Sequence, residues 1–259
     1  MTNGSHPNSL PEPRKENTAT CVIGEMRGCR RGVPSEGFRV MRPLSDLSSE
    51  LAGASDRCEP RRCLYVAKGP SAVHALDFLG WGDIATVNAA GLLFPRIDWS
   101  FWCDVPPGSE IAGFRDRCRA FVVPDQLHTG TFDFLRLTHG RRATEDVPDF
   151  PRDRTVVYPY DFIKDDRRSI LRNLRHGRVP MCMTAPAGLF ILARHLCYRE
   201  IWCFGHDGGM GYATGIPLQR SELYNYDKFR RAMETVADWL RTELDTTIHF
   251  WPERPARTE

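Results

Sequence analysis

From residue 63 onward, short apolar runs alternate with segments of helical periodicity, and this alternation constrains the fold more than any other feature of the chain. Short apolar strands separated by helices form a mainly parallel sheet with helices on both faces. The sequence therefore predicts an α/β, Rossmann-like domain. Its strands are expected at 63–67, 83–87, 97–102, 119–123, 155–158, 200–204 and 247–251. Its helices are expected from Ser71 to Leu79 and at 108–117, 166–176, 187–198 and 226–244.

The 259 residues fit one large domain with tails. Residues 1–60 are rich in Pro, Gly, Ser, Glu and Arg and hold few long apolar patterns, so we expect a disordered or loosely packed N-terminal segment. Residues 61–252 are expected to form a Rossmann-like nucleotide-binding domain, and 253–259 a C-terminal tail.

Charge and cysteine content set the expected compartment and partners. There are 35 basic and 33 acidic residues, a net charge of +2, so the balance gives no indication of nucleic acid as a partner and leaves it open. The nine cysteines are odd in number and scattered, which is typical of small buried apolar residues in a reducing compartment. No apolar run approaches the roughly 20 residues of a membrane span. We expect a cytoplasmic protein without a membrane span.

Polar residues follow several of the expected strands, and they define a candidate site. They are Lys68-Gly69-Pro70-Ser71, Asn88, Asp104 and Gly205-His206-Asp207. Ligands of open α/β sheets bind outside the carboxyl ends of the strands, so we expect these residues to share one ligand site. The alternative is that they are ordinary turn residues.

Two turns lead into helices and are candidate phosphate sites, because helix amino termini attract anions. One is Gly69-Pro70-Ser71 and the other is Thr184–Gly188. Ordinary helix capping explains either of them equally well.

His206 and Asp207 are the candidate catalytic residues. A histidine at a strand end can act as a general base near neutral pH, and a purely structural hydrogen bond is the alternative. Asp104 and Asp207 are expected to hold a metal ion only if they meet across the sheet edge. The chain contains no P-loop, nucleophile elbow or H-E-x-x-H motif.

A row of arginines at 167–178 predicts a basic helix face. Arg168, Arg172 and Arg175 share that face by spacing. A solvated face balanced by Asp165 and Asp166 is favoured over an anion-binding surface.

Two blocks of the chain resemble the bacterial sialyltransferase-like superfamily. The first is Leu64–Ser71 followed by Val87-Asn88, and the second runs from Ala187-Gly188-Leu189 through Arg199–Asp207. The same blocks are similar to pterin pyrophosphokinase-like proteins and motility-associated glycosyltransferases. The resemblance implies a Rossmann-like fold in which Gly69, Pro70, Ser71 and Asn88 contact a nucleotide, Gly188 lies close to it and Tyr212 contacts its phosphate.

The resemblance implies a glycosyltransferase that moves a sugar from a CMP- or UDP-sugar type of donor to a hydroxyl acceptor without a metal. In the sialyltransferases a histidine before the last long helix is the base, but residues 223–228 here hold no histidine, which leaves His206 as the candidate base. One alternative is a Mg²⁺-dependent ATP pyrophosphokinase-like transferase with Asp104 and Asp207 as metal ligands. Another is a non-catalytic nucleotide-binding module.

Overall fold

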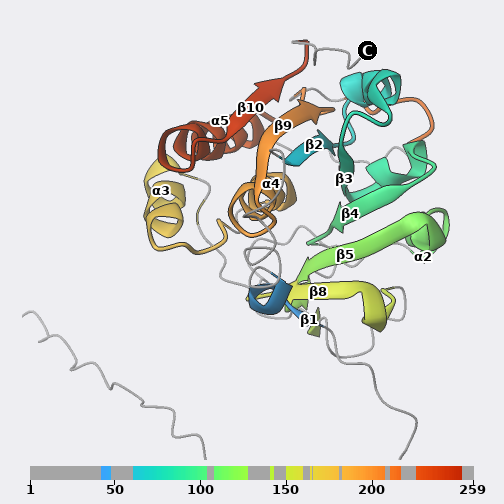
Figure 1. The fold of residues 1–259 in the computed structure, drawn as a ribbon, viewed down its shortest axis with the longest axis horizontal. Helices are drawn as coiled ribbons and strands as arrows, with labels where there is room; N and C mark the ends of the chain where they lie inside the picture. Colours follow the sequence, from blue (N-terminus) through green and yellow to red (C-terminus); the bar gives the residue numbers. More distant parts are fainter. Residues whose placement is uncertain are drawn as a thin grey trace, which may run out of the picture. The chain divides into compact units, whose positions relative to one another are not determined.

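In the computed structural model the described residues form one eight-stranded sheet in which every neighbouring pair of strands is parallel (Figure 1). The structure describes residues 42–47, 61–103, 108–127, 141–142, 150–159, 164, 166–180, 183–207, 211–216 and 226–252. The strand order is β1-β8-β5-β4-β3-β2-β9-β10. The expected α/β, Rossmann-like fold is therefore confirmed.

The strands have the short lengths typical of a buried parallel sheet. Their bounds are β1 (Arg42–Pro43), β2 (Arg61–Val66), β3 (Asp83–Val87), β4 (Ile97–Phe101), β5 (Cys118–Pro124), β8 (Thr155–Tyr158), β9 (Tyr198–Phe204) and β10 (Thr247–Phe250). A separate antiparallel pair joins β6 (Gln126–Leu127) to β7 (Arg141–Arg142).

Helical segments cover both faces of the sheet. One face carries α3 (Arg167–Arg175), α4 (Thr184–Arg194) and α5 (Tyr226–Glu243), and their apolar side chains share one core with the strands. In Figure 1 α4 lies against the middle of the sheet, with α3 and α5 beside it. The other face carries α2 (Gly108–Ala112) and the 3₁₀ segments η2 (Pro70–Phe78) and η3 (Asn88–Leu93). Two short 3₁₀ turns, η4 (Arg115–Arg117) and η5 (Arg152–Arg154), directly precede β5 and β8.

Most of the expected elements are present within one or two residues of their expected bounds. The strands expected at 83–87 and 155–158 have those bounds in the structure. The helices expected at 166–176 and 226–244 run over 167–175 and 226–243, so each of their ends lies within one residue of its expected position. β1 was not expected. It lies inside the segment predicted to be a loose tail, pairs with β8, and is followed by Leu44, which is buried in the core. The rest of that segment, 1–41 and 48–60, lies outside the described residues, as does 253–259.

Three helix predictions are corrected by the structure. The helix expected at 108–117 ends at Ala112, and the separate 3₁₀ turn η4 follows it. The segment after β2 is a 3₁₀ helix that begins after Gly69, so Ser71 lies within it and does not cap it. The helix expected to reach Tyr198 ends at Arg194, because Cys197 has a left-handed backbone with φ +58° and Tyr198 already belongs to β9. None of the described helices has both the length and the apolar character needed to cross a membrane.

Candidate functional site

The order of the strands reverses at β2. From β2 the chain adds β3, β4, β5 and β8 on one side, and it then returns to place β9 on the other side of β2. At such a switch point the flanking connections leave on opposite faces of the sheet, and ligands bind in the crevice outside the carboxyl ends of the strands. Here η2, which follows β2, packs on one face, and α4, which precedes β9, packs on the other. The residues after β2 and β9 therefore border the candidate site.

Hydrogen bonds join the segments that follow β2 and β9. The Gly69 N–H donates to the Gly205 carbonyl at 2.9 Å, the Ser71 N–H donates to Oδ2 of Asp207 at 2.9 Å, and the Gly205 N–H donates to Oγ of Ser71 at 2.7 Å. A Cβ on Gly69 would lie 2.5 Å from Asp207 Oδ2. This close approach of two strand ends explains why the turn has glycine there.

The same hydrogen bonds occupy the backbone donors of the turn that were predicted to hold a phosphate. The N–H groups of Gly69 and Ser71 are engaged by the segment after β9, that of Ala72 donates to the Gly69 carbonyl at 3.0 Å, and Pro70 has none. In this conformation an anion at the turn has to be bound by side chains. One oxygen of Asp207, a candidate catalytic residue, is likewise engaged in holding the turn.

His206 follows β9 at the switch point, and its imidazole lies against Tyr65 of β2. The two ring centroids are 4.9 Å apart. Burial lowers the pKa of His206 to about 4, partly offset by the nearby Asp207 and by a hydrogen bond with the Tyr65 backbone. The ring is therefore neutral at neutral pH.

The tautomer of His206 follows from the same contacts. Nε2 is buried and has no hydrogen-bond partner among the described residues, so we assign the proton of the neutral ring to Nδ1. In the neutral ring, the nitrogen without the proton carries a lone pair. Nε2 of His206 is thus a buried acceptor with its lone pair unused.

Asn88 lies at the end of the neighbouring strand β3. Its backbone is left-handed, with φ +52°, and its buried side-chain Oδ1 has no hydrogen-bond partner in the part of the chain that the structure describes. Left-handed asparagines and unsatisfied buried acceptors are both uncommon, and they concentrate at functional sites. The switch-point region therefore contains two buried acceptors, from Asn88 and His206, that the described protein leaves unsatisfied.

Gly188 has a packing role in the structure. It is buried, and a Cβ at this position would lie 2.3 Å from the Tyr65 hydroxyl and 3.1 Å from the Phe101 ring. The Tyr65 hydroxyl in turn donates to the Ala185 carbonyl in the first turn of α4, at 2.8 Å. Gly188 thus allows Tyr65 to fix the amino end of α4 against the sheet. The sequence singled out Gly188 but gave no sign of Tyr65 as its partner.

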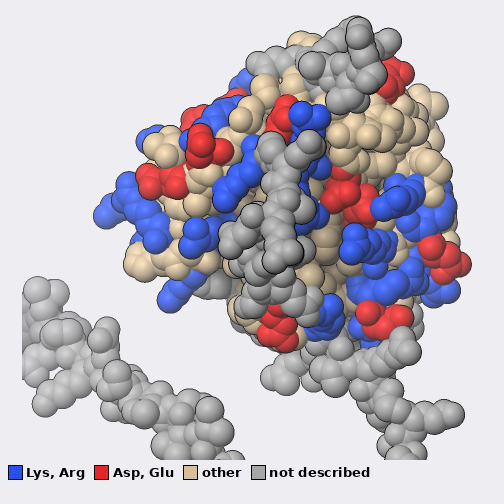
Figure 2. All heavy atoms as spheres, viewed as in Figure 1, with Lys and Arg blue, Asp and Glu red and all other residues tan. Residues whose placement is uncertain are grey.

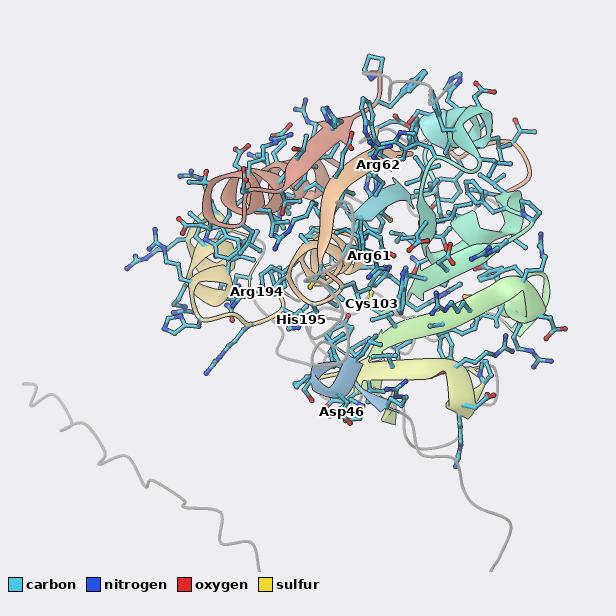
Figure 3. All side chains as sticks on the ribbon, in the orientation of Figure 1. Asp46, Arg61, Arg62, Cys103, Arg194 and His195 are labelled. Atoms are coloured by element: carbon cyan, nitrogen blue, oxygen red, sulfur yellow. The ribbon has the colours of Figure 1, made fainter. Side chains whose placement is uncertain are left out.

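Cys103 and Thr184 are a further pair at this edge that the sequence did not identify. Cys103 follows β4, and its Sγ is in hydrogen-bond contact with Oγ1 of Thr184, the first residue of α4 (Figure 3). Both residues are buried. The pair positions the amino end of α4 over β4, as Tyr65 positions it over β2.

Tyr212 and Lys68 form a pair beside the turn after β2. The Lys68 Nζ lies 4.7 Å from the centroid of the Tyr212 ring, and the Lys68 carbonyl accepts a hydrogen bond from the Ala213 N–H at 2.9 Å. Tyr212 itself is half-buried against the core. Tyr212, predicted to contact a phosphate, therefore lies at the switch point next to a cation.

Of the two expected metal ligands, the structure describes only Asp207. Asp104 lies outside the described residues. Within the described residues, no group of three or more His, Cys, Asp or Glu side chains is arranged to hold a metal ion.

The basic helix face belongs to a different part of the surface. On α3, Arg168, Arg172 and Arg175 are exposed. Figure 2 shows acidic side chains interspersed with the basic ones on this side of the molecule. A groove of about 520 Å³ between α3 and α5 is lined by both charges, namely Asp166, Arg167, Lys228, Arg231, Glu234, Thr235 and Asp238. The lining includes Arg167 but not Arg168, Arg172 or Arg175, and Glu234 and Asp238 of α5 supply acidic groups that were not expected.

The amino end of the sheet carries a polar network with a structural role. Arg61 and Arg62 leave β2 on opposite faces (Figure 3). Arg61 donates to Asp83 at 3.0 Å and to the Tyr198 hydroxyl at 2.8 Å, and the same hydroxyl accepts from Trp99 Nε1 at 2.7 Å. Burial raises the pKa of Tyr198, so the phenol stays protonated. The network ties β2, β3, β4 and β9 together at the end opposite the candidate site.

The structure defines a Rossmann-like α/β protein whose strand order reverses at β2, and the residues after β2 and β9 form its candidate site. No protein-family model matches the chain, and no curated protein is similar to it at a significant level. The resemblance of the two short blocks to the sialyltransferase-like superfamily therefore stays a prediction from the sequence.

Proposed function

We propose that the protein is a glycosyltransferase that moves a sugar from a nucleotide-sugar donor of the CMP or UDP type to a hydroxyl acceptor. The observation that carries the proposal is the state of His206. A neutral imidazole with a buried, unused Nε2 lone pair lies at the switch point, where Rossmann-like proteins bind their ligands. The resemblance to the sialyltransferase-like superfamily supplies the class of donor.

In the proposed reaction His206 acts as the general base. The bond between the anomeric carbon of the sugar and the donor phosphate oxygen breaks, and that oxygen keeps the electron pair. The acceptor hydroxyl oxygen forms the new bond to the anomeric carbon, and its proton moves to Nε2 of His206. Since the pKa of His206 is about 4, the imidazole is a weak base that takes the proton only as the new bond forms, when the hydroxyl has become acidic.

The other site residues have supporting roles in this proposal. In the proposal, Asn88 Oδ1, a buried acceptor, receives a hydrogen bond from the base or ribose of the nucleotide. Asp207 positions the turn after β2 through Ser71 and is not required to touch the substrate. The Mg²⁺-dependent alternative relies on Asp207 and on Asp104, which lies outside the described residues.

A donor-cleavage assay tests the proposal. The protein is incubated with CMP- and UDP-sugars, with and without a mixture of hydroxyl acceptors, and the release of free nucleotide is measured. We expect release that increases with one class of acceptor and is lost in His206→Ala. A wild-type protein that binds the nucleotide but releases none from any donor would instead identify a non-catalytic nucleotide-binding module.

A further inference from the structure

Lys68 holds a distinctive position at the switch point. It follows the end of β2 by two residues. The described residues one or two positions after the other strands of the sheet include Asn88, Cys103, Asp125, His206 and Trp251. Lys68 differs from these five in having a side chain that is ordinarily cationic at neutral pH.

The segment at 211–213 fixes Lys68 at both its backbone and its side chain. The Ala213 N–H binds the Lys68 carbonyl, and the Tyr212 ring lies 4.7 Å from Nζ. Gly211 packs on Pro70, because a Cβ at Gly211 would lie 3.1 Å from Pro70 Cγ. A cation–π contact orients the ammonium group and leaves its net charge unchanged. The segment therefore lies over the turn and holds a cation beside it.

The turn itself needs such a cation if it is to bind an anion. In related architectures a phosphate is bound by free N–H groups of the glycine-containing turn. Here the N–H groups of Gly69, Ser71 and Ala72 are already engaged within the protein. A phosphate at this position depends on a charged side chain, and Lys68 lies within the same turn.

We infer that Lys68, oriented by Tyr212, is the residue that binds the phosphate of the nucleotide donor and stabilises the negative charge on the phosphate as it leaves. This inference rests on the proposed function, and it names the group that recognises the donor's phosphate. An ammonium group acts on a phosphate as a point charge, and its effect increases as charge develops on the leaving oxygen. Such binding is expected without a divalent ion.

Calorimetric titration of three ligand types tests the role of Lys68. The ligands are the nucleotides CMP and UDP, the nucleosides cytidine and uridine, and inorganic pyrophosphate, each in the presence of a chelator. The proteins are wild type, Lys68→Met, Lys68→Arg and the control Lys164→Met, which removes an exposed lysine elsewhere in the chain. Far-UV circular dichroism and thermal unfolding establish that each variant is folded.

We expect Lys68→Met to weaken binding of the nucleotide and of pyrophosphate about tenfold to a hundredfold, the range for one charge-assisted hydrogen bond, and to leave nucleoside binding unchanged. Lys68→Arg should keep most of the affinity, and Lys164→Met should match wild type. Nucleotide binding by Lys68→Met equal to that of wild type would overturn the role of Lys68 and leave the proposed function standing. Pyrophosphate binding that depends on Lys68, without binding of any nucleotide, would instead support the anion site and overturn the proposed function.

Discussion

Oδ2 of Asp207 accepts a hydrogen bond from the backbone N–H of Ser71 at 2.9 Å, across 136 positions of the chain. The bond joins the segment after β9 to the segment after β2, the two strands between which the strand order reverses. A carboxylate that binds a backbone N–H at the start of a helical segment acts as a cap supplied from another part of the fold. The geometry of the candidate site therefore depends on a contact that neither segment makes alone.

The first prediction concerns this contact. Asp207→Ala should lower the free energy of unfolding by about 1 kcal/mol, because the Ser71 N–H loses its acceptor. It should also raise the hydrogen-exchange rate of the Ser71 amide, measured by NMR, more than that of amides in α5. Asp77→Ala, which alters an exposed acidic residue of η2, is the matched control. Equal exchange at Ser71 in wild type and Asp207→Ala would show that the contact is not formed in solution.

The second prediction concerns the base. His206→Ala should reduce turnover of the donor by about 10²–10⁴-fold and leave nucleotide affinity within a few-fold of wild type. Because the pKa of His206 is about 4, the turnover of the wild-type protein should stay level from pH 8 to pH 6 and should show no acid limb near 6.5. Unchanged turnover in His206→Ala would remove His206 from the mechanism.

A third prediction concerns the packing of Gly188. Gly188→Ala should destabilise the fold by about 1–3 kcal/mol, because its Cβ would lie 2.3 Å from the Tyr65 hydroxyl. In Gly188→Ala/Tyr65→Phe that hydroxyl is absent, so the two changes together should cost less than the sum of the single changes. Urea unfolding of the four proteins measures the coupling. Strict additivity would mean that the two residues do not meet.

A fourth prediction concerns the dependence of stability on pH. Burial lowers the pKa of both His195 and His206 to about 4, below the value of about 6.5 in an unfolded chain. As the pH falls, these histidines therefore become protonated in the unfolded chain before they do so in the folded protein. The free energy of unfolding that they contribute is fully present above pH 6.5 and is lost between about pH 6.5 and pH 4. Each histidine should contribute roughly 2 kcal/mol of the loss between pH 7 and pH 5.

The measurement for this prediction is urea unfolding at pH 7 and pH 5. His195→Gln and His206→Gln should each remove part of the difference between the two pH values, and the double variant should remove most of it. A difference that is the same in the double variant as in wild type would assign the acid sensitivity to other groups.

Much of the fold was predictable because the pattern of apolar residues is local. The strand at 83–87 and the helix at 226–243 each carry their own periodicity, and both were placed to within a residue. β1 was missed because its two residues become a strand only by pairing with β8, more than a hundred positions away. The early end of α4 was missed because Cys197, which has a left-handed backbone, is not a residue type that marks a helix end.

The candidate site was predictable in position but not in detail. The crevice rule located Ser71, Asn88 and His206 at one edge of the sheet from the sequence alone. The engagement of the turn's N–H groups by the segment after β9 arises from tertiary hydrogen bonds, which no local pattern reports. The pairing of Lys68 with Tyr212 has the same origin.

Thermal unfolding in the presence of nucleotides tests the central claim, a nucleotide site at the switch point between β2 and β9, most directly. The protein is heated with CMP, UDP, GDP, ADP or ATP, each with and without Mg²⁺. All five are used at one concentration, about 100 times the dissociation constant of the nucleotide that binds most tightly. A bound nucleotide at that excess stabilises the fold by roughly 2.7 kcal/mol, which raises the Tm of a domain of this size by about 5–10 °C. We predict this rise with CMP or UDP in the absence of Mg²⁺. The account would be contradicted by an unchanged Tm with every nucleotide, or by a rise with ATP alone that requires Mg²⁺.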